Sequence, residues 1–196
     1  MRLFADDRRF RTRVDMARHR FGLGEYKYFG VPLPPTVAAL RVHLYRHLTP
    51  IANHWAELLG VEERYPADLP AYLARCAARG QRRPTPLLLH YVAGGYNCLH
   101  QDVYGALAFP LQVTCMLSQV GEDYAGGEFL LVEQRPRAQS RGEAIALARG
   151  EAVIFPNRDR PVRGIRGCYR VSVRHGVSRL RSGERMTLGV IFHDAA

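Results

Sequence analysis

Cysteine is scarce in this 196-residue sequence, and Cys76, Cys98, Cys115 and Cys168 stand far apart. Because no C-x-x-C pair occurs, the spacing argues against a zinc knuckle and a disulfide framework, and we expect reduced thiols. No apolar run approaches the ~20 residues of a membrane span. The opening stretch MRLFADDRRFRTR also lacks the apolar core of a signal peptide. We therefore expect a cytoplasmic protein with no membrane partner.

Lysine is almost absent, since Lys27 stands alone beside 27 arginines, and arginine carries most of the net charge of +10. The planar guanidinium forms bidentate hydrogen bonds with phosphate oxygens, which suggests a nucleic-acid partner. The alternative is a solvated surface whose arginines reflect a GC-rich genome. Residues 158–185 hold nine arginines against two acidic residues. That segment is the better candidate for a phosphate-facing surface.

The length fits one domain, residues 1–196, which would bury roughly 70% of the surface of its unfolded chain. Phe10, Val14, Ala17 and Phe21 recur at helical spacing and predict an amphipathic helix over residues 7–20. A second helix is predicted over residues 36–59, with a kink at Pro50. A third runs over residues 68–80 from an aspartate N-cap.

From residue 84 onward, short apolar runs alternate with glycine and proline, as in PLLLHYV, GEFLLVE and MTLGVIF. This spacing predicts six to eight strands of a sandwich or barrel. The expected fold class is α+β, with a helical N-terminal portion, 1–83, packed on an all-β core, 84–196. The sequence predicts no particular oligomeric state.

One polar constellation stands out. His100 and Asp102 lie two residues apart in YVAGGYNCLHQDVYG, so on an extended segment both side chains project to the same side. Alone, this pair suits a hydrogen-bonded turn, but His175 is a candidate third ligand. Two histidines and one carboxylate bind Fe(II) in non-haem oxygenases and leave positions open for co-substrate and oxygen. Arg185, with Thr187 on the same expected strand face, would suit the far carboxylate of a dicarboxylic acid.

These residues resemble the motifs of the Fe(II)/2-oxoglutarate-dependent dioxygenases, whose core is a double-stranded β-helix, or jelly roll. Tyr91 stands nine residues before His100, and LHQD at 99–102 is similar to the AlkB-type nucleic-acid demethylases. The ending HGVSRLRSGERMT, at 175–187, is similar to that of prolyl-hydroxylase-like members. Over nearly the whole chain, the sequence resembles a bacterial 2-oxoglutarate/Fe(II) oxygenase family described as acting oxidatively on alkylated DNA.

The resemblance implies Fe(II) bound by His100, Asp102 and His175, and 2-oxoglutarate bound through Arg185, Tyr91 and Thr187. Asn97 and Tyr104 flank the H-x-D motif and are candidates for lining the pocket. Gln112 and Thr114 share a face of an expected core strand and are weaker candidates. The family reaction consumes O2 and converts 2-oxoglutarate to succinate and CO2. On an N-methyl group it would release formaldehyde, the chemistry of DNA repair.

The chain departs from the AlkB-type pattern at two places. Leu89 stands where those enzymes place an asparagine, and no second arginine follows Arg185. A protein (prolyl-type) or small-molecule hydroxylase therefore stays an alternative, as does a catalytically silent DNA-binding module. His90 suits a core position. His43 and His47 lie one helical turn apart but have no acidic or cysteine partner nearby for zinc.

Overall fold

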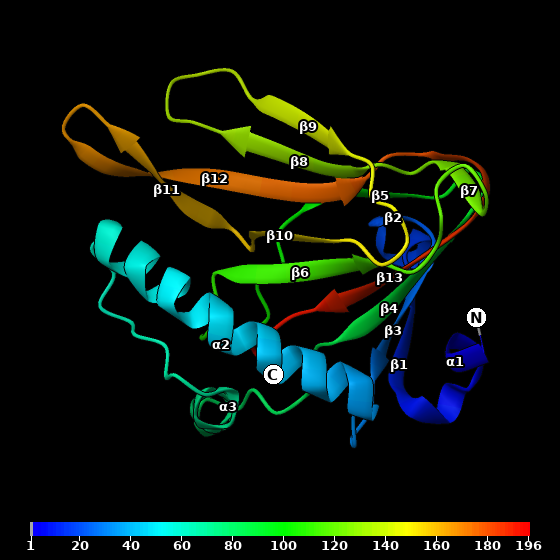
Figure 1. Ribbon diagram of the computed structural model, residues 1–196, viewed down its shortest axis with the longest axis horizontal. Helices are drawn as coiled ribbons and strands as arrows, with labels where there is room; N and C mark the ends of the chain where they lie inside the picture. Colours follow the sequence, from blue (N-terminus) through cyan, green and yellow to red (C-terminus); the bar gives the residue numbers. More distant parts are fainter. Residues whose placement is uncertain (1) are drawn as a thin grey trace.

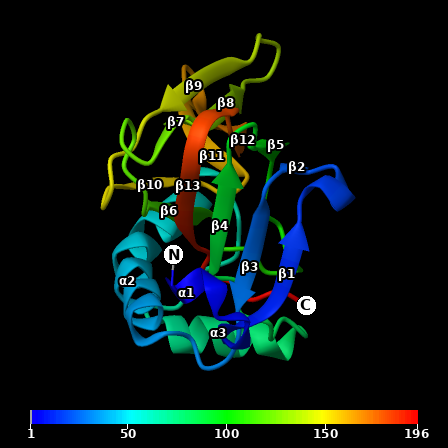
Figure 2. The ribbon, with the colours of Figure 1, turned by 90° about the vertical axis from the view of Figure 1, so that its right-hand side faces the viewer.

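The computed structural model describes residues 2–196. Two antiparallel sheets face one another, and helices cover the outer side of one of them (Figures 1 and 2). The α-helices are α1 (Arg2–Ala5), α2 (Pro35–Leu58) and α3 (Leu69–Ala78), and the 3-10 helices are η1 (Asp7–Arg9) and η2 (Ala17–His19). The strands are β1 (Phe10–Asp15), β2 (Gly22–Leu23), β3 (Glu25–Phe29), β4 (Leu87–Val92), β5 (Tyr96–His100), β6 (Leu111–Met116), β7 (Tyr124–Gly126), β8 (Phe129–Gln134), β9 (Arg141–Ile145), β10 (Ala152–Pro156), β11 (Asp159–Gly164), β12 (Gly167–Val177) and β13 (Leu180–Val190).

The larger sheet has the order β1-β3-β4-β13-β6-β10, and β7 pairs with β13. The smaller sheet has the order β2-β5-β12-β8-β9, and β11 pairs with β12. The chain crosses repeatedly between the two sheets. This arrangement confirms the α+β prediction with a jelly-roll core. Residues 84–196 contribute the ten strands β4 to β13, more than the six to eight predicted. The prediction of a single domain stays a prediction.

The N-terminal segment differs from its prediction. Residues 7–20 form no long helix, because β1 occupies Phe10–Asp15 and pairs antiparallel with β3. Phe10, Thr12 and Val14 also alternate with arginine, so the same residues fit a strand period of two. The pairing places the Phe10 ring on Phe29, with 4.9 Å between ring centroids. Residues 2–83 therefore form a mixture of strands and helices, in place of the helical portion predicted over 1–83, and β1 and β3 extend the larger sheet.

The second and third predicted helices are confirmed. α2 continues past Pro50 to Leu58, and the kink predicted there stays a prediction. α3 begins after Asp68, whose carboxylate accepts a hydrogen bond from the Ala71 amide at 2.9 Å. Across residues 2–196, the helices are all too short or too polar to span a membrane.

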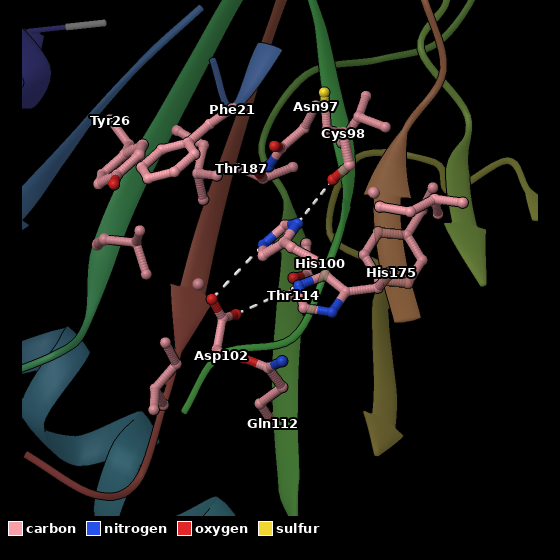
Figure 3. Close-up of a pocket in the computed structure, with 18 of the residues that line it drawn as sticks. Phe21, Tyr26, Asn97, Cys98, His100, Asp102, Gln112, Thr114, His175 and Thr187 are labelled. Atoms are coloured by element: carbon pink, nitrogen blue, oxygen red, sulfur yellow. Dashed lines mark hydrogen bonds and ion pairs between the residues drawn. The ribbon is translucent and has the colours of Figure 1, made fainter. Parts of the chain in front are cut away.

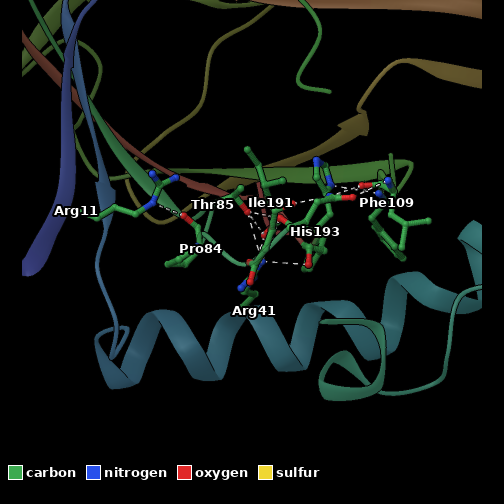
Figure 4. Close-up of polar contacts among 11 residues, drawn as sticks. Arg11, Arg41, Pro84, Thr85, Phe109, Ile191 and His193 are labelled. Carbon is green, nitrogen blue, oxygen red and sulfur yellow. Dashed lines mark hydrogen bonds and ion pairs between the residues drawn. The ribbon is translucent and has the colours of Figure 1, made fainter. Parts of the chain in front are cut away.

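A buried arginine fastens α2 to the end of β13. Arg41 is 3% exposed and donates hydrogen bonds to the carbonyls of Ile191 and Phe192, at 2.9 and 3.1 Å (Figure 4). It also forms an ion pair with Asp194 at 2.7 Å. These carbonyls follow the last strand, and the guanidinium satisfies them together with the Thr85 hydroxyl, which donates to the Ile191 carbonyl at 3.3 Å. The contact holds the helical layer against the sheet that carries Arg185.

Candidate metal and co-substrate site

Three ligand-type side chains converge between the sheets. His100 ends β5, Asp102 lies in the segment after it, and His175 sits on β12 directly opposite His100 in the strand register. The Nε2 atoms of His100 and His175 lie 3.5 and 3.2 Å from the two carboxylate oxygens of Asp102 (Figure 3). One ligand atom from each residue lies within 4.8 Å of the others. The structure thus brings together the three residues that the sequence predicted.

Neighbouring groups fix the orientation of these side chains. Nδ1 of His100 lies 2.8 Å from the Cys98 carbonyl, to which it donates when protonated, which leaves Nε2 as the free lone pair. The hydroxyl of Tyr104 donates to Asp102. The rings of Phe129 and Phe155 pack against His175 at 6.0 and 4.7 Å between centroids. Ligand orientation is therefore set before any ion binds.

Burial and charge act on the three ligands in opposite senses. Burial alone would raise the pKa of Asp102, but hydrogen bonds and attraction from the two imidazoles hold it well below its usual value. Burial lowers the pKa of His175, and Asp102 opposes this only in part. Burial would also lower the pKa of His100, but the Asp102 carboxylate raises it overall. An ionised carboxylate beside imidazoles is a suitable donor set for a divalent cation.

The donor set itself indicates the metal. Two imidazole nitrogens and one carboxylate, without thiolate, are the ligands of non-haem Fe(II) sites. Within residues 2–196, no other group of three histidine, cysteine or acidic residues meets the same geometric condition. His43 and His47 lie side by side on α2, with 4.7 Å between ring centroids, and are outside this cluster.

Arg185 is the second chemical feature of the site. It lies on β13 opposite Tyr91 of β4, is fully buried, and lines the same cavity as the three ligands, a space of about 380 Å³. None of its three guanidinium nitrogens has a hydrogen-bond partner among residues 2–196, and the Tyr91 hydroxyl has none either. The guanidinium carbon lies 5.6 Å from the centroid of the Tyr91 ring. A buried cation with unused donors suits a carboxylate ligand.

The other predicted pocket residues also reach this cavity. Thr187 lies two residues beyond Arg185 on β13, and Asn97 lies on β5. Tyr104, Gln112 and Thr114 line it as well. The structure therefore brings every predicted site residue to one cavity.

Part of the cavity wall comes from the N-terminal segment and was not predicted from the sequence. Arg20, Phe21, Tyr26 and Tyr28 line the cavity. The Phe21 carbonyl accepts a hydrogen bond from the Cys98 amide at 2.8 Å, which seats this segment on β5. Arg20 adopts a left-handed conformation with φ of 59°. The predicted helix over residues 7–20 would have directed Arg20 and Phe21 elsewhere, so this error in the fold concealed them.

Comparison with known proteins now identifies the family. Residues 24–195 match the family model Oxygenase-NA, described as an oxygenase catalysing oxidative methylation of damaged DNA. The chain belongs to this family. It is also 54% identical over 168 residues to two Mycobacterium tuberculosis proteins, Uncharacterized protein MT2286 of strain CDC 1551 / Oshkosh and Uncharacterized protein Rv2227 of strain ATCC 25618 / H37Rv. These matches cover 86% of this chain and 72% of each relative.

Solved structures similar to this chain include a 2OG-Fe(II) oxygenase family oxidoreductase from Burkholderia pseudomallei, at 18% identity and a TM-score of 0.41. A Pseudomonas putida prolyl-4-hydroxylase matches at 17% identity and a TM-score of 0.40. Each match covers 57% of this chain, but only 43% and 51% of those chains, respectively.

Family membership makes this Oxygenase-NA chain an oxidoreductase. An oxygenase with two histidines and one carboxylate in one cavity, of which Asp102 and His175 are buried, fits Fe(II). The unpartnered guanidinium in the same cavity fits the far carboxylate of 2-oxoglutarate. These are the cofactors expected from the sequence.

Proposed function

We propose that this protein is an Fe(II)- and 2-oxoglutarate-dependent dioxygenase that removes methyl groups oxidatively from alkylated DNA. The observation that carries the proposal is the Arg185 guanidinium, fully buried and without hydrogen-bond partners among residues 2–196, in the cavity that holds His100, Asp102 and His175. A purely structural arginine at this depth would be expected to pair with a protein acceptor. Its unused donors instead suit an anionic ligand that enters with the metal.

In this proposal His100, Asp102 and His175 hold Fe(II). Arg185 receives the far carboxylate of 2-oxoglutarate, Tyr91 and Thr187 offer it hydroxyl groups, and Asn97 lines the same space. The carboxylate of Asp102 offsets part of the metal charge. The rings of Phe129 and Phe155 keep water from the His175 side of the cavity.

The chemistry follows from these two groups. When bound, Fe(II) and 2-oxoglutarate supply the oxidation: one atom of O2 enters a methyl C–H bond as hydroxyl, the other enters succinate, and CO2 is lost. A hydroxymethyl group on nitrogen then loses formaldehyde and leaves N–H. Oxidation of a methyl group on a DNA base therefore removes it.

Two observations support DNA as the substrate. The family description names damaged DNA. The chain also carries a net charge of +10, and residues 158–184 hold eight arginines besides the buried Arg185. Such a charge favours binding to phosphate groups.

The test is a turnover assay with Fe(II), 2-oxoglutarate and a panel of methylated oligonucleotides, single- and double-stranded. We expect formaldehyde and succinate in equal amounts from the wild type, none from His100→Ala, and wild-type amounts from His43→Ala. His43 is the matched control because it is an exposed histidine outside the cavity. Absence of turnover on the whole panel by a protein that binds 2-oxoglutarate would contradict the DNA substrate.

Other outcomes of this assay distinguish the alternatives. Succinate formation coupled to a peptide or small molecule, but not to DNA, would indicate a protein or small-molecule hydroxylase. DNA binding without any consumption of 2-oxoglutarate in the presence of Fe(II) would indicate a silent binding module.

A further inference from the structure

The β11–β12 hairpin continues the sheet edge on which His100 lies. Ser172 pairs with both β8 and β11, and His175 pairs with both β8 and β5. Since a strand has only two edges, β5 and β11 lie end to end along the edge of β12 opposite β8. The side-chain amide of Gln101 connects β12 to the segment that leads into β11, because its Nε2 donates to the Val173 carbonyl at 2.8 Å and to the Arg158 carbonyl at 3.3 Å. The candidate metal site and the hairpin therefore belong to one continuous edge.

This hairpin projects beyond the larger sheet, together with the neighbouring β8–β9 hairpin (Figure 1). Gly167, at its turn, lies eight residues before His175 on β12. At about 3.4 Å per residue, the turn is about 27 Å from the metal ligand. That distance corresponds to about eight base pairs of duplex DNA.

The tip of the hairpin exposes a large apolar side chain. Gly164 pairs with Gly167, so Ile165 and Arg166 form a two-residue turn. Gly167 has a φ of 115°, which suits glycine. Ile165 is 105% exposed relative to the reference state, so nothing packs on it. Apolar residues at the tip of a protruding basic element can contact bases in a groove or between base steps.

The charge around the tip has one sign. Arg163, Arg166 and Arg174 are exposed and form no ion pair within the described residues 2–196, whereas Arg170 pairs with Asp159. No acidic residue occurs from 160 to 183. Because Arg163 lies opposite Cys168, strand alternation places it on the same face as Arg174. A surface of unpaired arginines beside an exposed apolar tip matches a polyanion with apolar bases.

We propose that the β11–β12 hairpin is a two-stranded ribbon that binds duplex DNA about eight base pairs from the nucleotide at the metal site. This inference rests on the proposed function. A ribbon of two strands fits the major groove, where Ile165 would contact base edges while Arg163 and Arg166 contact phosphates. The substrate would then be a duplex longer than the reacting site itself. Anionic membranes also attract arginines and apolar tips, but the continuity with the oxygenase site favours DNA.

The test compares two methylated duplexes, one with about four base pairs on each side of the methylated base and one with about fifteen, so that only the longer can reach the tip. We expect the wild type to bind the longer duplex at least about tenfold more tightly. Arg163→Glu/Arg166→Glu should abolish this preference and reduce the salt slope by about two. Ile165→Asp should weaken the preference.

Arg79→Glu/Arg82→Glu is the matched control, because it makes the same change of charge at exposed arginines beside α3. It should keep the preference for the longer duplex. All variants should consume 2-oxoglutarate at the wild-type rate in the absence of DNA, which shows that the site is folded.

If the hairpin variant and the control prefer the longer duplex equally, the proposal of a DNA-binding ribbon is overturned, while the proposed function stays intact. The ribbon proposal would also be overturned if Ile165→Asp removed binding to vesicles of anionic phospholipid but left DNA binding unchanged. A wild type that neither binds nor oxidises any methylated duplex would contradict the proposed function and the ribbon together.

Discussion

Replacing Arg185 with methionine should make the ligand-free protein more stable and unable to bind 2-oxoglutarate. The side chain is fully buried, and its three nitrogens have no hydrogen-bond partner among residues 2–196. A buried donor left without a partner costs about 1–3 kcal/mol, and more when it is charged. Loss of the contact with the Tyr91 ring offsets about 0.5–1 kcal/mol of the gain. Methionine is unbranched and apolar, and fills most of the same space.

The net effect of Arg185→Met is a gain of about 1–2 kcal/mol in the free energy of unfolding. For a chain of this length, that raises Tm by about 2–8 °C. Saturation of the wild type with 2-oxoglutarate at about 100 times Kd, with Mn(II) present, should add about 2.7 kcal/mol, or about 5–10 °C. The variant should show none of this second increase.

Thermal unfolding with Mn(II), in the presence and absence of 2-oxoglutarate, measures both effects. Arg181→Met is the control, because Arg181 lies on the same strand with an exposed side chain. Arg181→Met should leave both the Tm of the ligand-free protein and the increase in Tm on adding 2-oxoglutarate almost unchanged. If the Arg185→Met variant is less stable than the wild type and is still stabilised by 2-oxoglutarate, the claim that the Arg185 guanidinium binds 2-oxoglutarate is refuted.

Three further predictions concern the surroundings of the site. Tyr104→Phe removes the hydrogen bond to Asp102 and should weaken Mn(II) binding by about 10–100-fold in calorimetry; unchanged affinity would count against a role for the hydroxyl. Burial lowers the pKa of His193 to about 4, so the unfolded chain binds this proton first as pH falls from about 6.5 to 4, and stability should fall by about 3 kcal/mol in that window. His193→Asn should flatten this part of the urea-derived stability profile, and an identical profile would contradict the assignment. Arg41→Met leaves buried acceptors unpaired and should cost about 3 kcal/mol in urea unfolding, against almost none for the exposed Arg46→Met.

The candidate site was predictable because its residues carry chemical constraints that the sequence displays. His100 and Asp102 stand two apart before a turn. His175 and Arg185 stand ten apart, and Thr187 follows Arg185 two residues later. The strand register then places His175 opposite His100, and Arg185 opposite Tyr91. Sequence resemblance supplied the partners, and pairing of distant strands brought them together.

The N-terminal strand was not predictable from periodicity alone. Phe10, Val14 and Phe21 fit a helical face, but Phe10, Thr12 and Val14 equally fit a strand. The choice depends on a tertiary contact, since β1 pairs with β3 and stacks Phe10 on Phe29. Because that pairing also carries Arg20 and Phe21 to the cavity, one wrong local prediction concealed part of the site.

The exposed tip of the β11–β12 hairpin was also invisible in the sequence. Ile165 belongs to an apolar class that is normally buried. Gly164 and Gly167 beside it indicate a turn, but they do not show whether that turn is covered or protrudes. Only the pairing of Gly164 with Gly167 shows that its side chain lies in solvent.

The most direct test of the central claim is a crystal structure of the protein with Mn(II) and 2-oxoglutarate. We predict a metal ion bound by Nε2 of His100, Nε2 of His175 and a carboxylate oxygen of Asp102, with the far carboxylate of 2-oxoglutarate on the guanidinium of Arg185. A metal bound elsewhere, or a 2-oxoglutarate carboxylate that leaves Arg185 without a partner, would contradict the account.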